Sequence, residues 1–194
     1  MAITRDTHRH QRRHRSPHAR RLKGVKLLAT DVDGVLTDAG MYYSESGDEW
    51  KKFNTRDGMG LKLLQRAGVI TAFVTMEDTK LVARRAAKLA ITEVHQGARD
   101  KLSVIHEMAV RHGLTLQEVG FIGDDVNDLE ALQAVGFSAA PADGLPPVRK
   151  VVDYVCRKKG GEGAVREVAD LILAARTQSR VRRLTSSKVA KLEN

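Results

Sequence analysis

The sequence has few of the features that mark secreted, membrane-spanning or disulfide-linked proteins. Cys156 is the only cysteine among the 194 residues, so no disulfide can form within the chain. No apolar run approaches the roughly 20 residues that a membrane-spanning helix needs. Residues 1–23 also lack the apolar segment of a secretory signal. We therefore expect a cytoplasmic protein that does not enter a membrane.

Acidic residues are outnumbered, but the positive excess is confined to the two ends of the sequence. The net charge is +9, yet residues 1–23 carry eight Arg or Lys against one Asp, and residues 175–194 carry six against one Glu. Segments so charged and so poor in apolar residues do not bury enough surface to fold alone. We predict disordered basic tails at 1–23 and 175–194, flanking one folded domain at 24–174. A weak contact between the tails and a polyanion is the alternative.

Apolar runs of strand length alternate with helical segments through the predicted domain. We expect strands at 25–30, 69–75, 91–97, 119–125, 137–139 and 153–156. We expect helices at 58–67, 78–90 with Asp78 as its N-cap, 100–112, 127–135 and 164–175, and an aromatic hairpin at 41–53. Such alternation predicts an α/β fold, a Rossmann-like doubly wound parallel sheet with helices on both faces.

Polar side chains stand where the predicted strands end, or where the next helix begins. These residues are Asp31, Asp33, Thr75, Lys101, Asp124 and Asp125. Because ligands of such sheets bind beyond the carboxyl ends of the strands, we expect these side chains to converge at one edge. Carboxylates that converge without a cation repel one another, so this edge is predicted to hold a cation or to carry out a reaction.

The motifs at this edge resemble those of a known enzyme superfamily. DVDGVLTD at 31–38 and GDDVND at 123–128 resemble the haloacid dehalogenase superfamily of phosphoryl-transfer enzymes. TDAGMYYSESGDEWKKFNTRDGMGL, QGARDKL and GGEGAVRE are similar to stretches of the 3-deoxy-D-manno-octulosonate 8-phosphate phosphatases and related sugar-acid phosphatases. The resemblance covers approximately residues 25–173 and leaves out both tails.

The resemblance implies a covalent mechanism centred on the first motif. Asp31 would be the nucleophile that forms an aspartyl-phosphate, and Asp33 the general acid that protonates the leaving alkoxide and then activates water. Residues two apart on an extended segment face the same way, which suits two carboxylates that flank one phosphoryl group. Gly34 would let backbone amides approach the phosphate oxygens.

The resemblance also implies that Mg²⁺ is the cofactor. The side chains of Asp31 and Asp124 and the backbone carbonyl of Asp33 would hold it, since this hard cation prefers oxygen ligands. Lys101 would supply a second positive charge and Thr75 a hydrogen bond to the phosphoryl group.

Further positions near this edge are also assigned. The resemblance implies that Asp128 orients Lys101 or a metal-bound water. Asp125 and Asn127 either cap the following helix or contribute to the substrate or metal shell. Arg56 and Asp57 are predicted to contact the substrate.

One position departs from the family pattern. The resembling phosphatases usually continue Gly-Arg after the strand-ending Thr, whereas this chain has Met76 and Glu77. If Glu77 faces the pocket, it should disfavour an acidic sugar phosphate. If it only precedes the helix N-terminus, it has no such effect.

The spacing of the motifs leaves no room for a cap domain over the site. Asp33 and Thr75 lie 42 positions apart, and a hairpin with one helix fills that segment. The resembling phosphatases are tetramers whose subunits close one another's sites, so we expect a homotetramer assembled through the hairpin around Tyr42, Tyr43 and Trp50. A hairpin packed within one chain is the alternative.

The sequence thus predicts a Mg²⁺-dependent phosphatase of a phosphorylated sugar acid such as 3-deoxy-D-manno-octulosonate 8-phosphate. One alternative is a phosphatase of another small phosphorylated sugar or of a nonulosonate 9-phosphate. The others are an assembly module that partners a sugar nucleotidyltransferase, and a nucleic-acid-binding protein that uses its tails, although the folded domain lacks an aromatic and basic groove.

Overall fold

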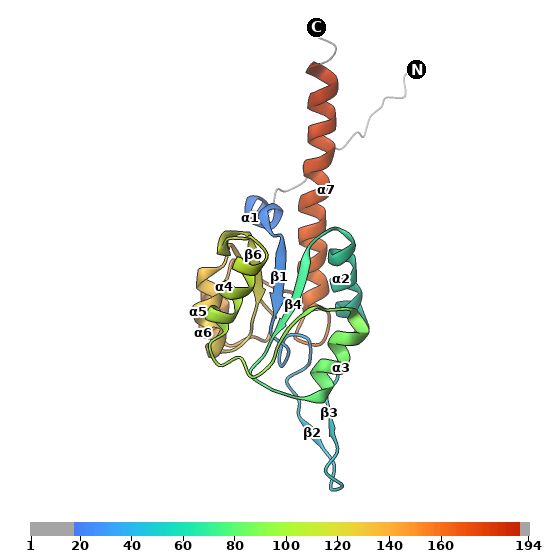
Figure 1. Ribbon diagram of the computed structural model, residues 1–194, viewed down its shortest axis with the longest axis vertical. Coiled ribbons are helices and arrows are strands. Elements are labelled where there is room, and N and C mark those ends of the chain that lie inside the picture. Colours follow the sequence, from blue (N-terminus) through green and yellow to red (C-terminus); the bar gives the residue numbers. More distant parts are fainter. Residues whose placement is uncertain (1–17, 191–194) are drawn as a thin grey trace, which may run out of the picture.

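A six-stranded parallel sheet forms the centre of the protein. The computed structural model describes residues 18–190, with side chains to residue 177. The spatial order of the strands is β5-β4-β1-β6-β7-β8 (Figure 1). Their bounds are β1 Leu27–Thr30, β4 Ile70–Val74, β5 Glu93–His95, β6 Val119–Ile122, β7 Phe137–Ala140 and β8 Tyr154–Val155. All adjacent strands pair in parallel, which confirms the predicted α/β fold.

Helices cover both faces of the sheet. One face packs against α1 Ala19–Gly24, α2 Thr55–Arg66, α3 Lys80–Leu89 and α7 Ala164–Ala190. The other packs against α4 Lys101–Arg111, α5 Leu129–Ala134 and α6 Pro146–Val151. Successive strand residues point to opposite faces, so Leu28 and Phe73 join the first core and Leu27 and Phe121 the second. Helix α6 was not predicted; Pro146 at its first position favours a helix start.

Side-chain caps fix where three of the helices begin. Asn54 caps α2 and Asp100 caps α4, each accepting a backbone N–H of the first turn. The prediction that Asp78 caps the third helix was wrong. Thr79 takes that position instead, because its hydroxyl accepts the N–H of Val82.

Both ends of the predicted domain differ from expectation. Helix α7 runs to Ala190 rather than ending near Ala175, because the intervening sequence contains neither Gly nor Pro. Arg176 ties this part of α7 to the body by donating to the carbonyls of Val25 and Ala67 at 3.0 and 3.1 Å. The outer end of α7 projects beyond the body (Figure 1).

The end of the predicted N-terminal tail is helical. In α1 the side chain of Leu22 is buried in the first core, and Arg21 pairs with Asp153. Residues 19–23 therefore pack on the domain, because one apolar side chain and one ion pair anchor them. Residues 1–17 of that tail and residues 191–194 lie outside the described part of the chain.

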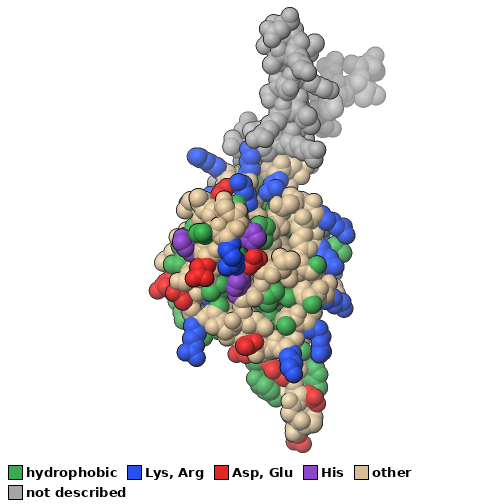
Figure 2. Space-filling model, in the orientation of Figure 1, with side chains coloured by type: hydrophobic (Ala, Val, Ile, Leu, Met, Phe, Trp, Pro, Cys, Tyr) green, Lys and Arg blue, Asp and Glu red, His purple; other side chains and the backbone are tan. Residues whose placement is uncertain are grey.

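A hairpin extends from the carboxyl edge of the sheet, opposite the outer end of α7 (Figure 1). Its strands are β2 Tyr42–Tyr43 and β3 Glu49–Trp50, which pair antiparallel as predicted. Tyr42, Tyr43 and Trp50 are 46%, 70% and 52% exposed, and Figure 2 shows hydrophobic side chains gathered where the hairpin leaves the body. Between Asp33 and Thr75 the chain forms only this hairpin, α2 and β4, so no cap domain is inserted there.

No helix among residues 18–190 is both long and apolar enough to cross a bilayer.

Candidate active site

The carboxyl edge of the sheet holds a small polar pocket. The hydrogen bonds of the sheet continue past the strands, since the Asp31 N–H donates to the Ile122 carbonyl and the Thr75 N–H to the His95 carbonyl, both at 2.9 Å. These bonds hold Asp31 directly after β1 and Thr75 directly after β4, so the two residues lie next to each other at this edge. The pocket has a volume of about 190 Å³ and is lined by Asp31, Asp33, Ala39, Thr75, Met76, Glu77, Lys101, Asp124, Asp125 and Asn127.

A buried ammonium joins two carboxylates at the base of the pocket. Lys101 Nζ lies 3.0 Å from Asp31 Oδ2 and 2.6 Å from Asp128 Oδ1. The other oxygen of Asp128 accepts the N–H groups of Asp124 and Asp125 at 2.9 and 3.2 Å. Asp128 is fully buried, so it holds both the lysine and the loop after β6 without facing the pocket.

The electrostatics of this cluster favour an added cation. Burial, and then the charge of Asp128, raises the pKa of Asp31 to about 7, although Lys101 opposes the shift. Burial, and then the charges of Asp31 and Asp128, raises the pKa of Asp124 to about 8. Burial lowers the pKa of Lys101, but Asp31 and Asp128 outweigh it, so that pKa is raised. The lysine alone does not neutralise the carboxylates.

The donor atoms fit a divalent metal. One oxygen from each of Asp31, Asp124 and Asp128 lies within 4.8 Å of the others. Oδ1 of Asp124 is buried and has no hydrogen-bond partner among the described residues. Asp31 and Asp124 line the pocket and Asp128 does not, so Asp31 and Asp124 are the carboxylates that suit a hard cation with oxygen ligands.

Gly34 permits this arrangement. Its φ is +84°, and a Cβ built on it would lie 2.0 Å from Asp124 Oδ2. The glycine therefore lets the loop after β1 approach the carboxylate of Asp124, and this contact rather than an approach to phosphate is what the structure shows.

Two partners of Asp33 were not predicted from the sequence. Lys51, directly after β3, places its Nζ 2.8 Å from Asp33 Oδ2, and its side chain is fully buried. The hydroxyl of Thr37 donates to Asp33 Oδ1 at 3.4 Å. Thr37 stands in the quoted DVDGVLTD motif, which could have suggested it. No local pattern separates Lys51 from its neighbour Lys52.

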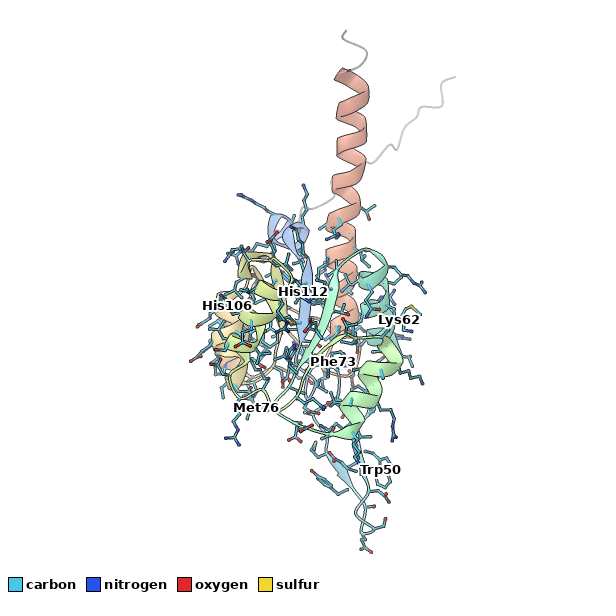
Figure 3. All side chains as sticks on the ribbon, viewed as in Figure 1. Trp50, Lys62, Phe73, Met76, His106 and His112 are labelled. Atoms are coloured by element: carbon cyan, nitrogen blue, oxygen red, sulfur yellow. The ribbon has the colours of Figure 1, made fainter. Side chains whose placement is uncertain are left out.

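Asp125 and Asn127 lie in the loop after β6, where each was expected either to cap a helix or to contribute to the substrate or metal shell. Asp125 caps the short 3₁₀ helix Val126–Asp128 by accepting the Val126 N–H, and it also lines the pocket. The amide of Asn127 contacts the Met76 sulfur across the pocket. Met76 lies beyond the carboxyl end of β4 (Figure 3).

Glu77 lines the pocket while remaining exposed to solvent. Its N–H donates to the Thr75 hydroxyl at 3.2 Å, which holds the backbone of this segment against the site. Lys101 is the one cationic side chain among the lining residues, against five carboxyl-bearing residues.

Two residues expected to contact substrate do not line the pocket. Asp57 is fully buried and accepts the Arg166 N–H at 2.8 Å, so its carboxylate caps the N-terminus of α7. Asp57 thus serves as a buried acceptor at a helix terminus in this structure and does not line the pocket. Arg56 lines a different cavity, together with Arg166.

The contact at Gly34 can be tested against a matched position. We expect Gly34→Ala to displace the carboxylate of Asp124 and to weaken Mg²⁺ binding about tenfold or more, as changes around a ligand commonly do. Gly47→Ala is the control, since its φ is +88° but nothing lies within 4 Å of the added Cβ. Calorimetric titration of both variants would contradict the account if they bound Mg²⁺ equally well.

The comparisons with known proteins agree with this geometry. Residues 68–168 match the family model of haloacid dehalogenase-like hydrolases. The 3-deoxy-D-manno-octulosonate 8-phosphate phosphatase KdsC of Yersinia pestis is 43% identical over 80% of this chain and 83% of its own. The KdsC protein of Escherichia coli K12 is 40% identical over 79% of this chain and 81% of its own.

Solved structures give the same result. The crystal structure of the Yersinia pestis phosphatase superposes with a TM-score of 0.81 at 42% identity, covering 82% of this chain and 86% of that one. The Moraxella catarrhalis phosphatase, solved with magnesium, phosphate and KDO, has a TM-score of 0.81 at 39% identity and covers 86% and 96%. The chain therefore belongs to the haloacid dehalogenase-like hydrolases, in the family of the 3-deoxy-D-manno-octulosonate 8-phosphate phosphatases.

Proposed function

We propose that this protein is a Mg²⁺-dependent phosphomonoesterase that hydrolyses a phosphorylated sugar acid, such as 3-deoxy-D-manno-octulosonate 8-phosphate. The observation that carries the proposal is the cluster of Asp31, Lys101 and Asp128 beside the unpartnered oxygen of Asp124. Family membership supports it, since the relatives bear the name of that phosphatase. The lone, buried Cys156 is consistent with a cytoplasmic location.

Asp31, Asp124 and the backbone carbonyl of Asp33 are the groups that would hold Mg²⁺. When bound, the cation supplies positive charge that offsets the negative phosphoryl oxygens beside Asp31. The Lys101 ammonium adds positive charge beside Asp31, and Asp128 keeps that ammonium in place. The Thr75 hydroxyl lines the same pocket and is available to donate to a phosphoryl oxygen.

Two carboxyl groups divide the chemistry. A carboxylate oxygen of Asp31 forms a bond to phosphorus while the bond from phosphorus to the sugar oxygen breaks. Asp33 gives its proton to the departing sugar oxygen. Asp33 then accepts a proton from water as the water oxygen attacks phosphorus, which releases inorganic phosphate and restores Asp31.

Replacing each carboxylate should separate these roles. We expect Asp31→Asn to abolish Mg²⁺-dependent hydrolysis of an aryl phosphate while the fold is retained, because the nucleophile is lost. Asp33→Asn should slow turnover by roughly 100- to 10,000-fold, the usual contribution of general acid–base catalysis. Asp33→Asn should also accumulate phosphate on Asp31.

Steady-state rates and intact-protein mass spectra check both expectations, with circular dichroism as the folding control. Wild-type turnover by Asp31→Asn would rule out the covalent mechanism.

We also propose that the enzyme is a homotetramer assembled through the hairpin. The exposed aromatic side chains of β2 and β3 and the lack of an inserted cap domain support this. An acidic substrate needs more cations than Lys101, and Arg56 or Arg166 of a neighbouring subunit are candidates.

We expect a Tyr43→Ser, Trp50→Ser double variant to dissociate and to lose activity. Val110→Ser, a change at a 62% exposed residue of α4, should do neither. Light scattering with parallel activity assays at micromolar concentration makes the comparison. An active wild-type monomer would exclude the tetramer.

Glu77 is proposed to shape substrate preference. A carboxylate in the pocket opposes a substrate that carries both carboxylate and phosphate, by an energy on the order of 1–3 kcal/mol at partly desolvated distances. We expect a Met76→Gly, Glu77→Arg variant to raise kcat/KM for the octulosonate phosphate relative to a neutral sugar phosphate by about tenfold.

Asp78→Arg is the matched control for this variant. It makes the same change of charge at the next residue in the sequence, and Asp78 does not line the pocket. A strong wild-type preference for the acidic sugar that the variant leaves unchanged would show that Glu77 does not discriminate.

A further inference from the structure

The hairpin delivers a buried lysine to the active site. Lys51 follows directly on Trp50, which Figure 3 labels on the hairpin. The side chain of Lys51 is 0% exposed, and its Nζ lies 2.8 Å from Asp33 Oδ2. The next residue, Lys52, is 58% exposed and pairs with Asp38 at 3.0 Å. Two adjacent lysines of one hairpin therefore differ in burial and in partner.

A buried ammonium is costly unless a charge compensates it. Removing such a group from water costs several kcal/mol, which only a close counter-charge with good geometry offsets. Among the described residues, Asp33 is the one acidic partner recorded for Lys51. The buried ammonium of Lys51 is therefore compensated by the carboxylate of Asp33, which is the proposed general acid.

The two oxygens of Asp33 have different surroundings. Oδ2 accepts from the Lys51 ammonium, and Oδ1 accepts from the Thr37 hydroxyl at 3.4 Å. That hydroxyl is itself fixed, because it accepts the N–H groups of Gly34 and Ala39, each at 3.3 Å. The ammonium therefore holds Oδ2, whereas the partner recorded for Oδ1 among the described residues is a neutral hydroxyl.

We propose that Lys51 is a positioning residue for Asp33. It holds Oδ2 so that Oδ1 passes its proton to the departing sugar oxygen as the bond from phosphorus to that oxygen breaks and Asp31 bonds to phosphorus. This inference rests on the proposed phosphatase function. It makes the hairpin part of the proton-transfer apparatus within each subunit, separately from any part in assembly.

The test uses the leaving group. Departure of an alkoxide needs a proton, whereas a good leaving group such as 2,4-dinitrophenolate departs without one. We expect Lys51→Met to lower kcat/KM for a sugar phosphate about 30- to 100-fold, the scale of a misplaced group. For 2,4-dinitrophenyl phosphate we expect a loss of less than about fivefold. A merely structural role would lower both values alike.

Three further variants sharpen the result. Lys52→Met removes the same charge one residue away and should change both values less than about twofold. In an Asp33→Asn background, Lys51→Met should have no further effect on the sugar phosphate, because the two residues act as one unit. Lys51→Gln keeps a hydrogen-bond donor to Oδ2, so its kcat/KM should fall less than that of Lys51→Met and should depend on the leaving group in the same way. If Lys51→Met does not fold, Lys51→Gln replaces it in the test.

The outcomes separate this inference from the proposed function. A wild type without Mg²⁺-dependent phosphatase activity overturns the function itself. An active wild type whose Lys51 variants lose equally on both substrates, or lose nothing, or add to Asp33→Asn, overturns only the role of Lys51.

Discussion

The balance of charge at the carboxyl edge is the constraint on which the rest of the site depends. Asp31 and Asp128 are buried and Asp124 is partly buried. Lys101 is the one cation among the described residues recorded against these three, and it pairs with Asp31 and Asp128. Burial raises the pKa of Asp31 and Asp124, and the remaining carboxylates raise both further. A second cation resolves this imbalance. The excess of carboxylate oxygens thus favours binding of a metal ion, and the bound metal ion in turn favours binding of a phosphate.

The parallel sheet is what creates that excess. Its strands all end at one edge, so the segments after β1, β4 and β6 meet there even though they are far apart in the sequence. Close backbone approach at Gly34 and the anchoring of the loop after β6 by Asp128 set the final distances. The hairpin of β2 and β3, which lies outside this sheet, is followed directly by Lys51. Through Lys51, Asp33, the proposed general acid, contacts the hairpin that is proposed for assembly.

Prediction from sequence worked where local pattern and topology agree. The alternation of strands and helices predicted the sheet, and the rule for strand ends brought Asp31, Thr75 and Asp124 to one pocket. It failed where the deciding contact is distant in the sequence. Asp57 precedes α7 by more than a hundred residues, so its role as the cap of that helix was invisible in the local pattern. Lys51 and Lys52 cannot be told apart in the sequence, because only the folded hairpin buries the side chain of Lys51 and leaves that of Lys52 exposed.

Calorimetric titration of the metal-free protein with Mg²⁺ between pH 6 and pH 9 tests the central claim most directly. With pKa values of about 7 and 8 for Asp31 and Asp124, protons compete with the cation at the lower end of this range. Binding should therefore tighten as the pH rises and release protons near neutrality, with little release at pH 9. Asp124→Asn should bind far more weakly at every pH. Absence of Mg²⁺ binding by the wild type, or equal binding by Asp124→Asn, would contradict the account.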